Sequence, residues 1–159
     1  MASPLVFVLL PLLAAPAALL LLAVAVLVRP RPVKVPVRGR HVFITGGSSG
    51  IGLALAKLAA AQGAKVSILA RSSPRLDGAR DEIRRATGVE VATYSADVRD
   101  EAAVKKAVDA AGTVDVLVCN HGVFVPQEVE SQPTEEIKFM VDVNLMGTFH
   151  LIKAALPGM

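Results

Sequence analysis

The sequence predicts an α/β fold: the N-terminal half of a doubly wound parallel sheet, preceded by one transmembrane helix. Short β-branched runs alternate with helix-length segments after residue 40, which is typical of βαβ units on a parallel sheet. A glycine-rich turn at residues 45–52 joins the first such run to the first helical segment. An unbroken apolar segment occupies residues 5–28 and accounts for the predicted transmembrane helix.

The apolar segment is long enough to cross a membrane. Residues 5–28 contain no charged or strongly polar side chain and are interrupted only by Pro11 and Pro16. As a helix they would extend about 36 Å, against about 30 Å for the hydrocarbon core of a bilayer. A cleaved signal peptide is the alternative, but the segment is longer than a usual signal core and no Lys or Arg precedes it. We therefore expect a membrane anchor over residues 1–28.

A proline-rich basic linker is expected over residues 29–40. It carries five basic residues and no acid, and its three prolines favour an extended backbone. Positive charge beside a membrane span is typical of the cytoplasmic side. The folded domain, residues 41–159, is therefore expected in the cytosol.

Composition excludes several classes of function for that domain. The whole chain has a net charge of +3, but all 14 acidic residues and only 12 of the 17 basic residues follow position 40, so the domain itself carries −2. With no basic stripe, a nucleic-acid partner is not expected. The single cysteine, Cys119, excludes an internal disulfide and is expected to be a buried strand residue. The three histidines lack metal-ligand spacing, so no metal site is predicted.

Strands and helices can be placed from the hydrophobic pattern and from punctuating residues. The expected strands are 41–45, 65–70, 89–94 and 114–119, and the expected helices are 50–62, 74–87, 100–111 and 133–155. Gly63, Gly88 and Gly112 follow the first three helices as terminating residues. Ser73 and Pro74 are expected to be the N-cap and first residue of the second helix. Four strands make only half of the usual doubly wound sheet.

The glycine-rich turn indicates a phosphate-binding site. Gly46, Gly50 and Gly52 lie between a strand and a helix, where bare backbone amides and the positive end of a helix favour an anion. A P-loop is excluded, because Gly52 is followed by Leu53 and Ala54 in place of the phosphate-binding lysine and the metal-binding hydroxyl. Dinucleotide binding is therefore the first functional hypothesis.

These residues resemble a known family. Thr45-Gly46-xxx-Gly50-Ile51-Gly52 is similar to the cofactor turn of the short-chain dehydrogenase/reductases, and Asp97-Val98, Asn120-His121-Gly122 and Asn144 follow in the family's order. The resemblance covers residues 41–159. It implies a Rossmann fold, a nicotinamide cofactor and oxidoreductase activity.

The resemblance assigns roles to most of these residues. It implies that the turn holds the cofactor through Gly46, Ser48, Ser49, Gly50, Ile51 and Gly52. Asp97 would accept a hydrogen bond from the adenine amino group while Val98 packs beside the ring; the alternative for Asp97 is an acid near a helix N-cap. Asn120 and Gly122 would lie against the nicotinamide ribose. His121 and Cys119 depart from the family's usual Asn-Asn-Ala-Gly, and an acid-base role for His121 is not expected.

The end of the second strand favours NADPH over NADH. NAD enzymes place an acid there to bind the ribose 2′-hydroxyl, whereas this sequence has Arg71. An arginine fork suits a 2′-phosphate, which a carboxylate would repel. Arg75 adds a second positive charge or is simply a solvated helix residue, and Ser48 and Ser49 offer hydroxyls.

The family's catalytic residues are only partly present. The resemblance makes Asn144 the asparagine that supports the active-site lysine through a water, and we expect it to be buried on an apolar helix face. A catalytic serine and a Tyr-xxx-Lys pair are missing, since the only tyrosine, Tyr94, lies on a predicted strand with Val98 four residues on. The chain is therefore expected to be an N-terminal portion that is inactive alone, with a tethered, non-catalytic NADPH-binding fragment as the alternative.

Within the family, the anchor and basic linker are similar to those of membrane-bound reductases in the endoplasmic reticulum. A lipid-like, long-chain ketone is the expected substrate, because such a molecule partitions into the membrane. Steroid, retinol and 3-ketoacyl reductases are the alternatives. The last helix, 133–155, commonly contributes to a dimer interface in this family, so a homodimer is a further expectation; the missing half of the sheet explains its apolar face equally well.

Overall fold

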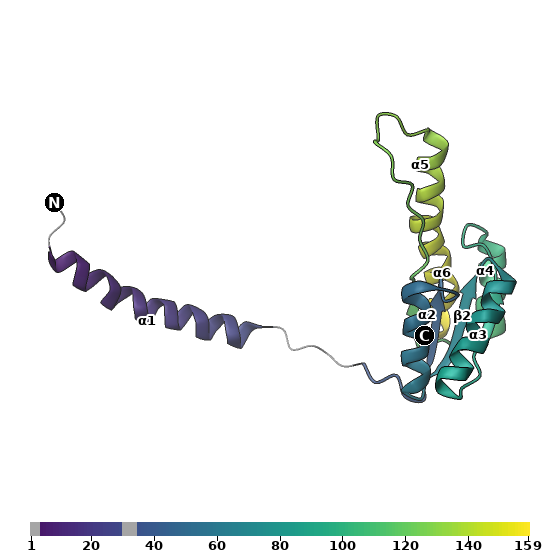
Figure 1. Ribbon diagram of the computed structural model, residues 1–159, viewed down its shortest axis with the longest axis horizontal. Helices are drawn as coiled ribbons and strands as arrows, with labels where there is room; N and C mark the ends of the chain where they lie inside the picture. The colour runs from purple at the N-terminus through teal and green to yellow at the C-terminus, as the bar shows by residue number, and fades with distance from the viewer. Residues whose placement is uncertain (1–3, 30–34) are drawn as a thin grey trace. The chain divides into compact units, whose positions relative to one another are not determined.

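The computed structural model describes residues 4–29 and 35–159, with side chains from Ala14 onward except at 30–34. The chain divides into two compact units, Met1–Val35 and Pro36–Met159. Among its described residues, the first contains one helix, α1 (Pro4–Val28) (Figure 1). The α1 side chains from Ala14 to Val28 are exposed. Part of the expected linker, residues 30–34, lies outside the described residues. The second unit begins before position 41, since the Gly39 amide donates to the Gly63 carbonyl at 2.9 Å.

A four-stranded parallel sheet forms the centre of the second unit, which confirms the predicted α/β architecture. Its strands are β1 (His41–Thr45), β2 (Lys65–Ala70), β3 (Ala92–Ser95) and β4 (Val116–Val118), in the order β3-β2-β1-β4. The first two match the expected ranges. β3 starts later and β4 is shorter than expected, because pairing begins only where Ala92 meets Ser67 and where Val116 meets Val42.

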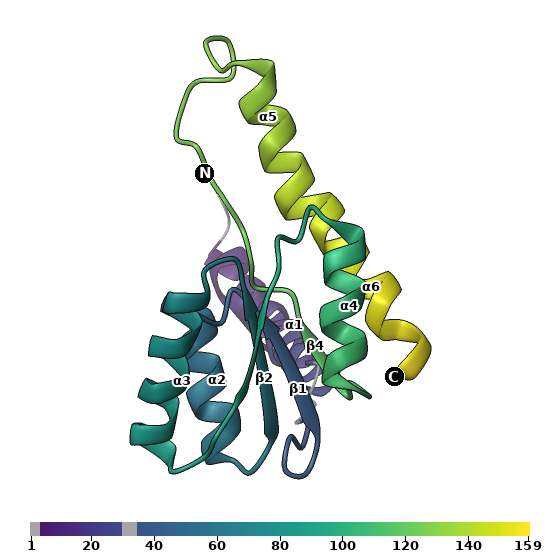
Figure 2. The ribbon, with the colours of Figure 1, turned by 90° about the vertical axis from the view of Figure 1, so that its right-hand side faces the viewer.

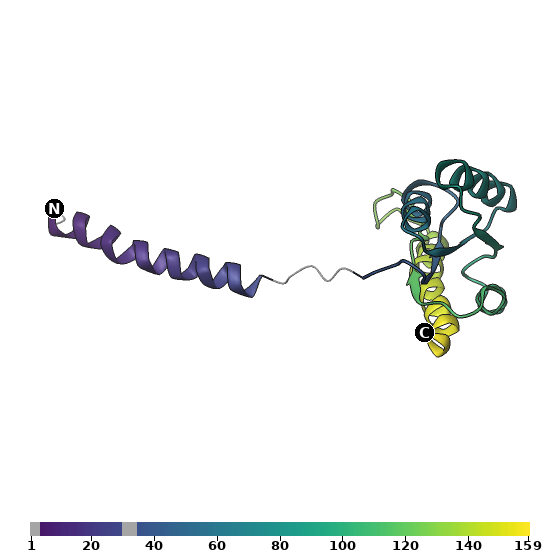
Figure 3. The ribbon, with the colours of Figure 1, turned by 90° about the horizontal axis from the view of Figure 1, so that it is seen from below.

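Helices cover both faces of this sheet. α2 (Gly50–Ala61) and α3 (Ser73–Thr87) lie on one face, and α4 (Glu101–Ala111) and α6 (Gly147–Ala155) lie on the other (Figures 2 and 3). The alternation of β1 side chains builds the two cores: Val42 and Ile44 pack with the α2 and α3 side, and Phe43 with the α4 and α6 side. Because both faces are covered, all five residues of β1 are buried and its central three, Val42 to Ile44, are apolar.

The helix ends follow local chemistry, with one correction. α3 begins at Ser73, not Pro74, and its N-cap is Ser72, because the Ser72 carbonyl accepts the first helical hydrogen bond, from the Leu76 amide at 3.0 Å. Gly88 ends α3 in the left-handed conformation at φ 72°, as expected. Asp100 caps α4 by accepting a hydrogen bond from the Ala103 amide at 3.0 Å.

The expected helix 133–155 is continuous but not uniform. It consists of α5 (Thr134–Val141), a π-helical turn η1 (Asp142–Met146) and α6, and a short 3₁₀ turn η2 (Leu156–Gly158) follows. By length and composition this run is apolar enough to cross a membrane. It nevertheless packs as a core helix at its C-terminal part, since Val143, Leu151 and Ala155 are buried against the sheet. α5 projects beyond the sheet, as Figure 1 shows.

Candidate functional site

A pocket of about 400 Å³ lies beyond the carboxyl ends of the strands. This is the edge at which open α/β sheets bind ligands, where β1 is flanked by β2 on one side and β4 on the other. All of the predicted cofactor residues line it except Gly50 and Gly52; the lining residues among them are Gly46, Ser48, Ser49, Ile51, Arg71, Arg75, Asp97, Val98, Asn120 and Gly122. The structure therefore brings together segments separated by as many as 76 positions, as between Thr45 and His121.

The conformation and packing of the turn require glycine, because a side chain would be strained at some of these positions and would clash at others. Gly46 and Gly50 have positive φ angles of 65° and 56°, a region that L side chains seldom adopt. A Cβ on Gly52 would collide with the Gly46 carbonyl oxygen and lie 2.5 Å from Asn120 Nδ2. Gly50 and Gly52 thus shape the pocket without lining it, because they let α2 begin directly against the loop after β4. Ser49, the residue before α2, makes no side-chain capping bond, so its hydroxyl remains available.

Thr45 joins the turn to the loop after β4. Its side chain is fully buried, and its Oγ1 accepts hydrogen bonds from the amides of Asn120 at 3.1 Å and His121 at 3.2 Å. Asn120 Nδ2 donates to the Thr45 carbonyl at 3.3 Å. No role of its own was predicted for Thr45, although a polar residue that ends a buried strand after the apolar Val42–Ile44 run is a signal for one.

His121 points inward from the pocket wall. Its Nδ1 lies 2.7 Å from Thr45 Oγ1, and its Nε2 lies 3.1 Å from the Val143 carbonyl oxygen. Burial lowers the pKa of the imidazole, although the hydrogen bond to the Val143 carbonyl acts in the opposite direction. Both ring nitrogens thus have hydrogen-bond partners within the protein, Nδ1 at Thr45 and Nε2 at Val143.

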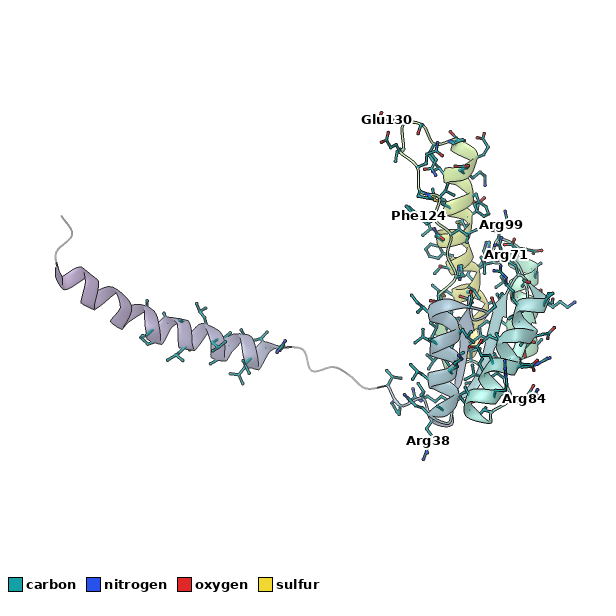
Figure 4. All side chains as sticks on the ribbon, viewed as in Figure 1. Arg38, Arg71, Arg84, Arg99, Phe124 and Glu130 are labelled. Atoms are coloured by element: carbon teal, nitrogen blue, oxygen red, sulfur yellow. The ribbon has the colours of Figure 1, made fainter. Side chains whose placement is uncertain are left out.

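Positive charge gathers at the ends of β2 and β3. Arg71 follows β2 and Arg75 lies on α3, and both are exposed at the pocket. Figure 4 shows Arg71 and Arg99 at the same end of the unit, opposite Arg38. An arginine suited to a phosphate therefore lies where the sequence analysis expected one.

Arg99 clamps the carboxylate of Asp97. Its Nη2 lies 2.7 Å and its Nε 3.1 Å from Asp97 Oδ2, and its amide donates to Asp97 Oδ1 at 3.0 Å. Hydrogen bonding to Arg99 is the main cause that lowers the pKa of Asp97. The Arg99 guanidinium also lies 5.1 Å from the centre of the Phe139 ring on α5. Asp100 is the N-cap of α4 and Asp97 lies three residues before it, so Asp97 is also an acid near a helix N-cap. The hydrogen bonds between Arg99 and Asp97 were not predicted from the sequence.

Asn144 lies on η1 and holds the loop after β4. Its Oδ1 accepts from the Val123 amide and its Nδ2 donates to the Val123 carbonyl, both at 2.8 Å. The expectation that Asn144 is buried is wrong: it is exposed, because no element of the described chain packs over that side of η1. Cys119 is also exposed rather than buried, since β4 ends at Val118 and lies at the edge of the sheet.

The remaining groups of the described pocket are suited to recognition. Tyr94 stacks on Phe43 with ring centres 5.9 Å apart and donates to the Ala110 carbonyl, so it belongs to the core. Among residues with described side chains, no group of three potential metal ligands comes together. The pocket offers backbone amides, hydroxyls, arginines and one carboxylate, a set that suits a phosphate-bearing nucleotide.

Comparison with known proteins agrees with this geometry. A family model described as short chain dehydrogenase matches residues 40–159. The 3-dehydrosphinganine reductases TSC10B and TSC10A of Arabidopsis thaliana are 64% and 60% identical to this chain over 127 residues, which is 80% of the chain. The chain spans 38% and 39% of their respective lengths.

Solved structures share the same fold. The structure of L-sorbose reductase from Gluconobacter frateurii, complexed with NADPH and L-sorbose, aligns with a TM-score of 0.74 and 30% identity. The alignment covers 80% of this chain and 50% of that one. A short-chain type dehydrogenase/reductase from Mycobacterium marinum aligns with a TM-score of 0.73 and 32% identity over 77% of this chain and 51% of that one.

Substitution of Gly52 should disrupt the turn. Gly52→Ala places a Cβ against the Gly46 carbonyl and Asn120, so we expect unfolding free energy to fall by about 1 to 3 kcal/mol. Gly78→Ala is the matched control, because Gly78 lies inside α3 with open space around it and should gain about 1 kcal/mol of helix stability. Thermal unfolding followed by circular dichroism measures both. Equal melting temperatures for the two variants would contradict the close approach.

Proposed function

The chain belongs to the short-chain dehydrogenase/reductase family, and on that premise we propose that it is the cofactor-binding part of an NADPH-dependent 3-dehydrosphinganine reductase. The reaction is the reduction of 3-ketodihydrosphingosine to sphinganine in sphingolipid biosynthesis. The observation that carries the proposal is the 60–64% identity to two proteins of that name over 127 residues, together with Arg71 in the pocket at the end of β2.

The pocket favours NADPH for electrostatic reasons. Arg71 and Arg75 stand where a carboxylate would be needed to bind an unphosphorylated ribose. Charge-assisted bonds from an arginine to a phosphate contribute roughly twice as much as neutral hydrogen bonds. Asp97 is ionised at neutral pH, and the hydrogen bond from Arg99 lowers its pKa further, so its carboxylate can accept from the adenine amino group. The arginines would thus bind the phosphate on the ribose, and Asp97 would bind the adenine ring at the other end of the adenosine.

Asn120, Gly122 and Asn144 organise the opposite end of the pocket. NADPH supplies a hydride for the ketone carbon when it is bound. The Gly122 backbone has no side chain to keep the nicotinamide ribose away, and a Cβ there would lie 3.4 Å from Asn144 Oδ1. Asn144 orients Val123, the next residue of the same loop, through two hydrogen bonds. The chain's residues thus bind and orient, while residues 1–159 contain no Tyr-xxx-Lys pair to donate the proton.

We propose that the enzyme is anchored in the endoplasmic reticulum membrane with its folded unit in the cytosol. The helical backbone of α1, the apolar composition of residues 5–28 and the basic residues after position 28 support this arrangement. A ketone with a long acyl chain partitions into lipid, so a tethered active site meets its substrate at the membrane surface. The lipid-ketone substrate and the anchor therefore form one proposal.

The anchor can be tested by extraction and protease protection. With a C-terminal epitope tag, the chain should stay with microsomes after alkaline carbonate treatment, and added protease should remove the tag without detergent. Deletion of residues 1–28 should release the protein into the supernatant. A tag protected until detergent is added would contradict the proposed orientation.

Cofactor preference should depend on Arg71. Arg71→Asp removes a phosphate partner and adds a repelling charge, so we expect NADPH affinity to fall more than tenfold while NADH affinity changes less than threefold. Arg80→Asp is the control, because Arg80 lies on α3 outside the pocket and pairs with Asp77 and Glu90. Isothermal titration calorimetry with each nucleotide measures both variants. Unchanged NADPH preference in Arg71→Asp would refute the assignment.

The substrate can be tested with a chimera. Residues 1–159 fused to the remaining C-terminal part of Arabidopsis TSC10B should give membranes that reduce 3-dehydrosphinganine with NADPH. The 159-residue chain alone should bind NADPH without turnover, because it lacks the proton donor. A chimera that folds and binds NADPH but reduces steroid, retinol or 3-ketoacyl substrates instead would overturn the substrate. Turnover by the chain alone would overturn its proposed role as a cofactor-binding part.

A further inference from the structure

We propose that His121 is a positioning residue that fastens the loop after β4 to the glycine turn and to η1, and that it does so as the neutral tautomer with its proton on Nε2. The loop is the segment from Asn120 to Val123. The proposal rests on the proposed cofactor site, because this loop forms the nicotinamide side of the pocket.

The tautomer follows from the hydrogen bonds of Thr45. A hydroxyl oxygen has two lone pairs and one proton. Both lone pairs of Thr45 Oγ1 are occupied by the amides of Asn120 and His121, at 3.1 and 3.2 Å. The hydroxyl proton then has two acceptors within reach, the Val118 carbonyl oxygen at 3.3 Å and the imidazole Nδ1 at 2.7 Å. The shorter distance favours donation to Nδ1, which then accepts and carries no proton.

The other nitrogen confirms the same arrangement. Nε2 of His121 lies 3.1 Å from the Val143 carbonyl oxygen, which can only accept. A neutral imidazole has one proton, and it is used here on Nε2. The side chain thus accepts a hydrogen bond from the end of β1 and donates one to η1, the helical turn that carries Asn144.

Space for the imidazole is provided by a glycine. A Cβ on Gly147 would lie 3.1 Å from His121 Nε2 and 2.7 Å from Val98 Cγ2. Gly147 is buried at the start of α6, directly after η1. The ring therefore occupies the junction of β1, the loop after β4, and η1, and the loop's position depends on it.

Protonation of His121 in acid should break the hydrogen bond that its Nδ1 accepts from Thr45. Protonation of His121 adds an N–H on Nδ1 that points at an oxygen whose lone pairs are already used. Charged and titratable groups on the surrounding elements have partners of their own: Asp97 binds Arg99, Asp142 binds Lys138, and His150 Nδ1 binds the Val98 carbonyl. Because burial lowers the pKa of His121, the neutral form contributes stability above pH 6.5, and this contribution is lost as pH falls through the folded-state pKa.

Nitrogen-15 spectra of the imidazoles test the tautomer directly. The chain has three histidines, so histidine-selective labelling of the full chain in detergent micelles yields three assignable rings. At pH 7.5 we expect His121 to carry its proton on Nε2. His41 is an internal control of opposite kind, since its Nδ1 lies 2.7 Å from the Thr113 carbonyl and must donate. A proton on Nδ1 of His121 at this pH would overturn the proposal, whether or not the chain binds cofactor.

Binding of NADP⁺ tests the functional consequence. His121→Leu removes both hydrogen bonds, and we expect NADP⁺ affinity at pH 7.5 to fall about tenfold, as loss of one to two net hydrogen bonds implies. His121→Gln keeps an amide donor near the Nε2 position, so affinity should stay within about threefold of the wild type. Equal affinity of the wild type, His121→Gln and His121→Leu would overturn the positioning role.

The pH dependence of NADP⁺ affinity separates the titration of His121 from the titration of the ligand's own phosphate. A 2′-phosphate has a second pKa near 6, so every variant should bind NADP⁺ more weakly in acid. The wild type and His150→Gln should show an additional loss between pH 7 and 5 that His121→Gln lacks. Identical profiles for all three proteins would contradict the acid-sensitive tie. A wild type that binds no NADP⁺ at any pH would instead overturn the proposed function, and the imidazole spectra would still decide the tautomer.

Discussion

The close approach of the glycine turn to the loop after β4 is the constraint on which the rest of the site depends. Thr45 supplies the bonds, since its one hydroxyl binds two amides and an imidazole. Gly46 and Gly52 supply the space, because a Cβ on either would meet Asn120. The hydrogen bonds of Thr45 and the lack of side chains at the two glycines therefore act at the same point. Both are needed to let α2 begin beside the pocket.

Parallel pairing explains why this point becomes a nucleotide site. β1 is hydrogen-bonded to β2 on one side and β4 on the other, so the chain leaves the sheet in opposite directions from neighbouring strands. The resulting crevice receives the start of α2, with its unpaired backbone amides, and the side chains that follow each strand. Arg71 follows β2, Asp97 follows β3 and Asn120 follows β4, so the segments after these three strands all line the crevice.

Charges within the pocket are organised by a second arginine. Asp97 would place a negative charge near Arg71, but Arg99 engages its carboxylate with short hydrogen bonds and rests on the Phe139 ring. The pocket therefore keeps a carboxylate at Asp97 while the end that holds Arg71 and Arg75 remains positive. Arg99 also links this end of the site to α5, the helix that projects beyond the sheet.

The sequence by itself determined the periodicity of the strands and helices, the glycine positions and the residues that follow each strand. These features predict the parallel sheet and most of the pocket, because the carboxyl ends of parallel strands meet at one edge whatever the details of packing. Only the tertiary structure decided the partners of Thr45, the inward orientation of His121, the clamp of Arg99 on Asp97 and the exposure of Asn144. The partners of Thr45, the orientation of His121 and the exposure of Asn144 depend on where segments distant in the chain meet. The hydrogen bonds of Arg99 to Asp97 depend on the direction that the Arg99 side chain takes beside α5. A hydrogen bond requires its two atoms within about 3 Å, and no local pattern specifies such a distance across a fold.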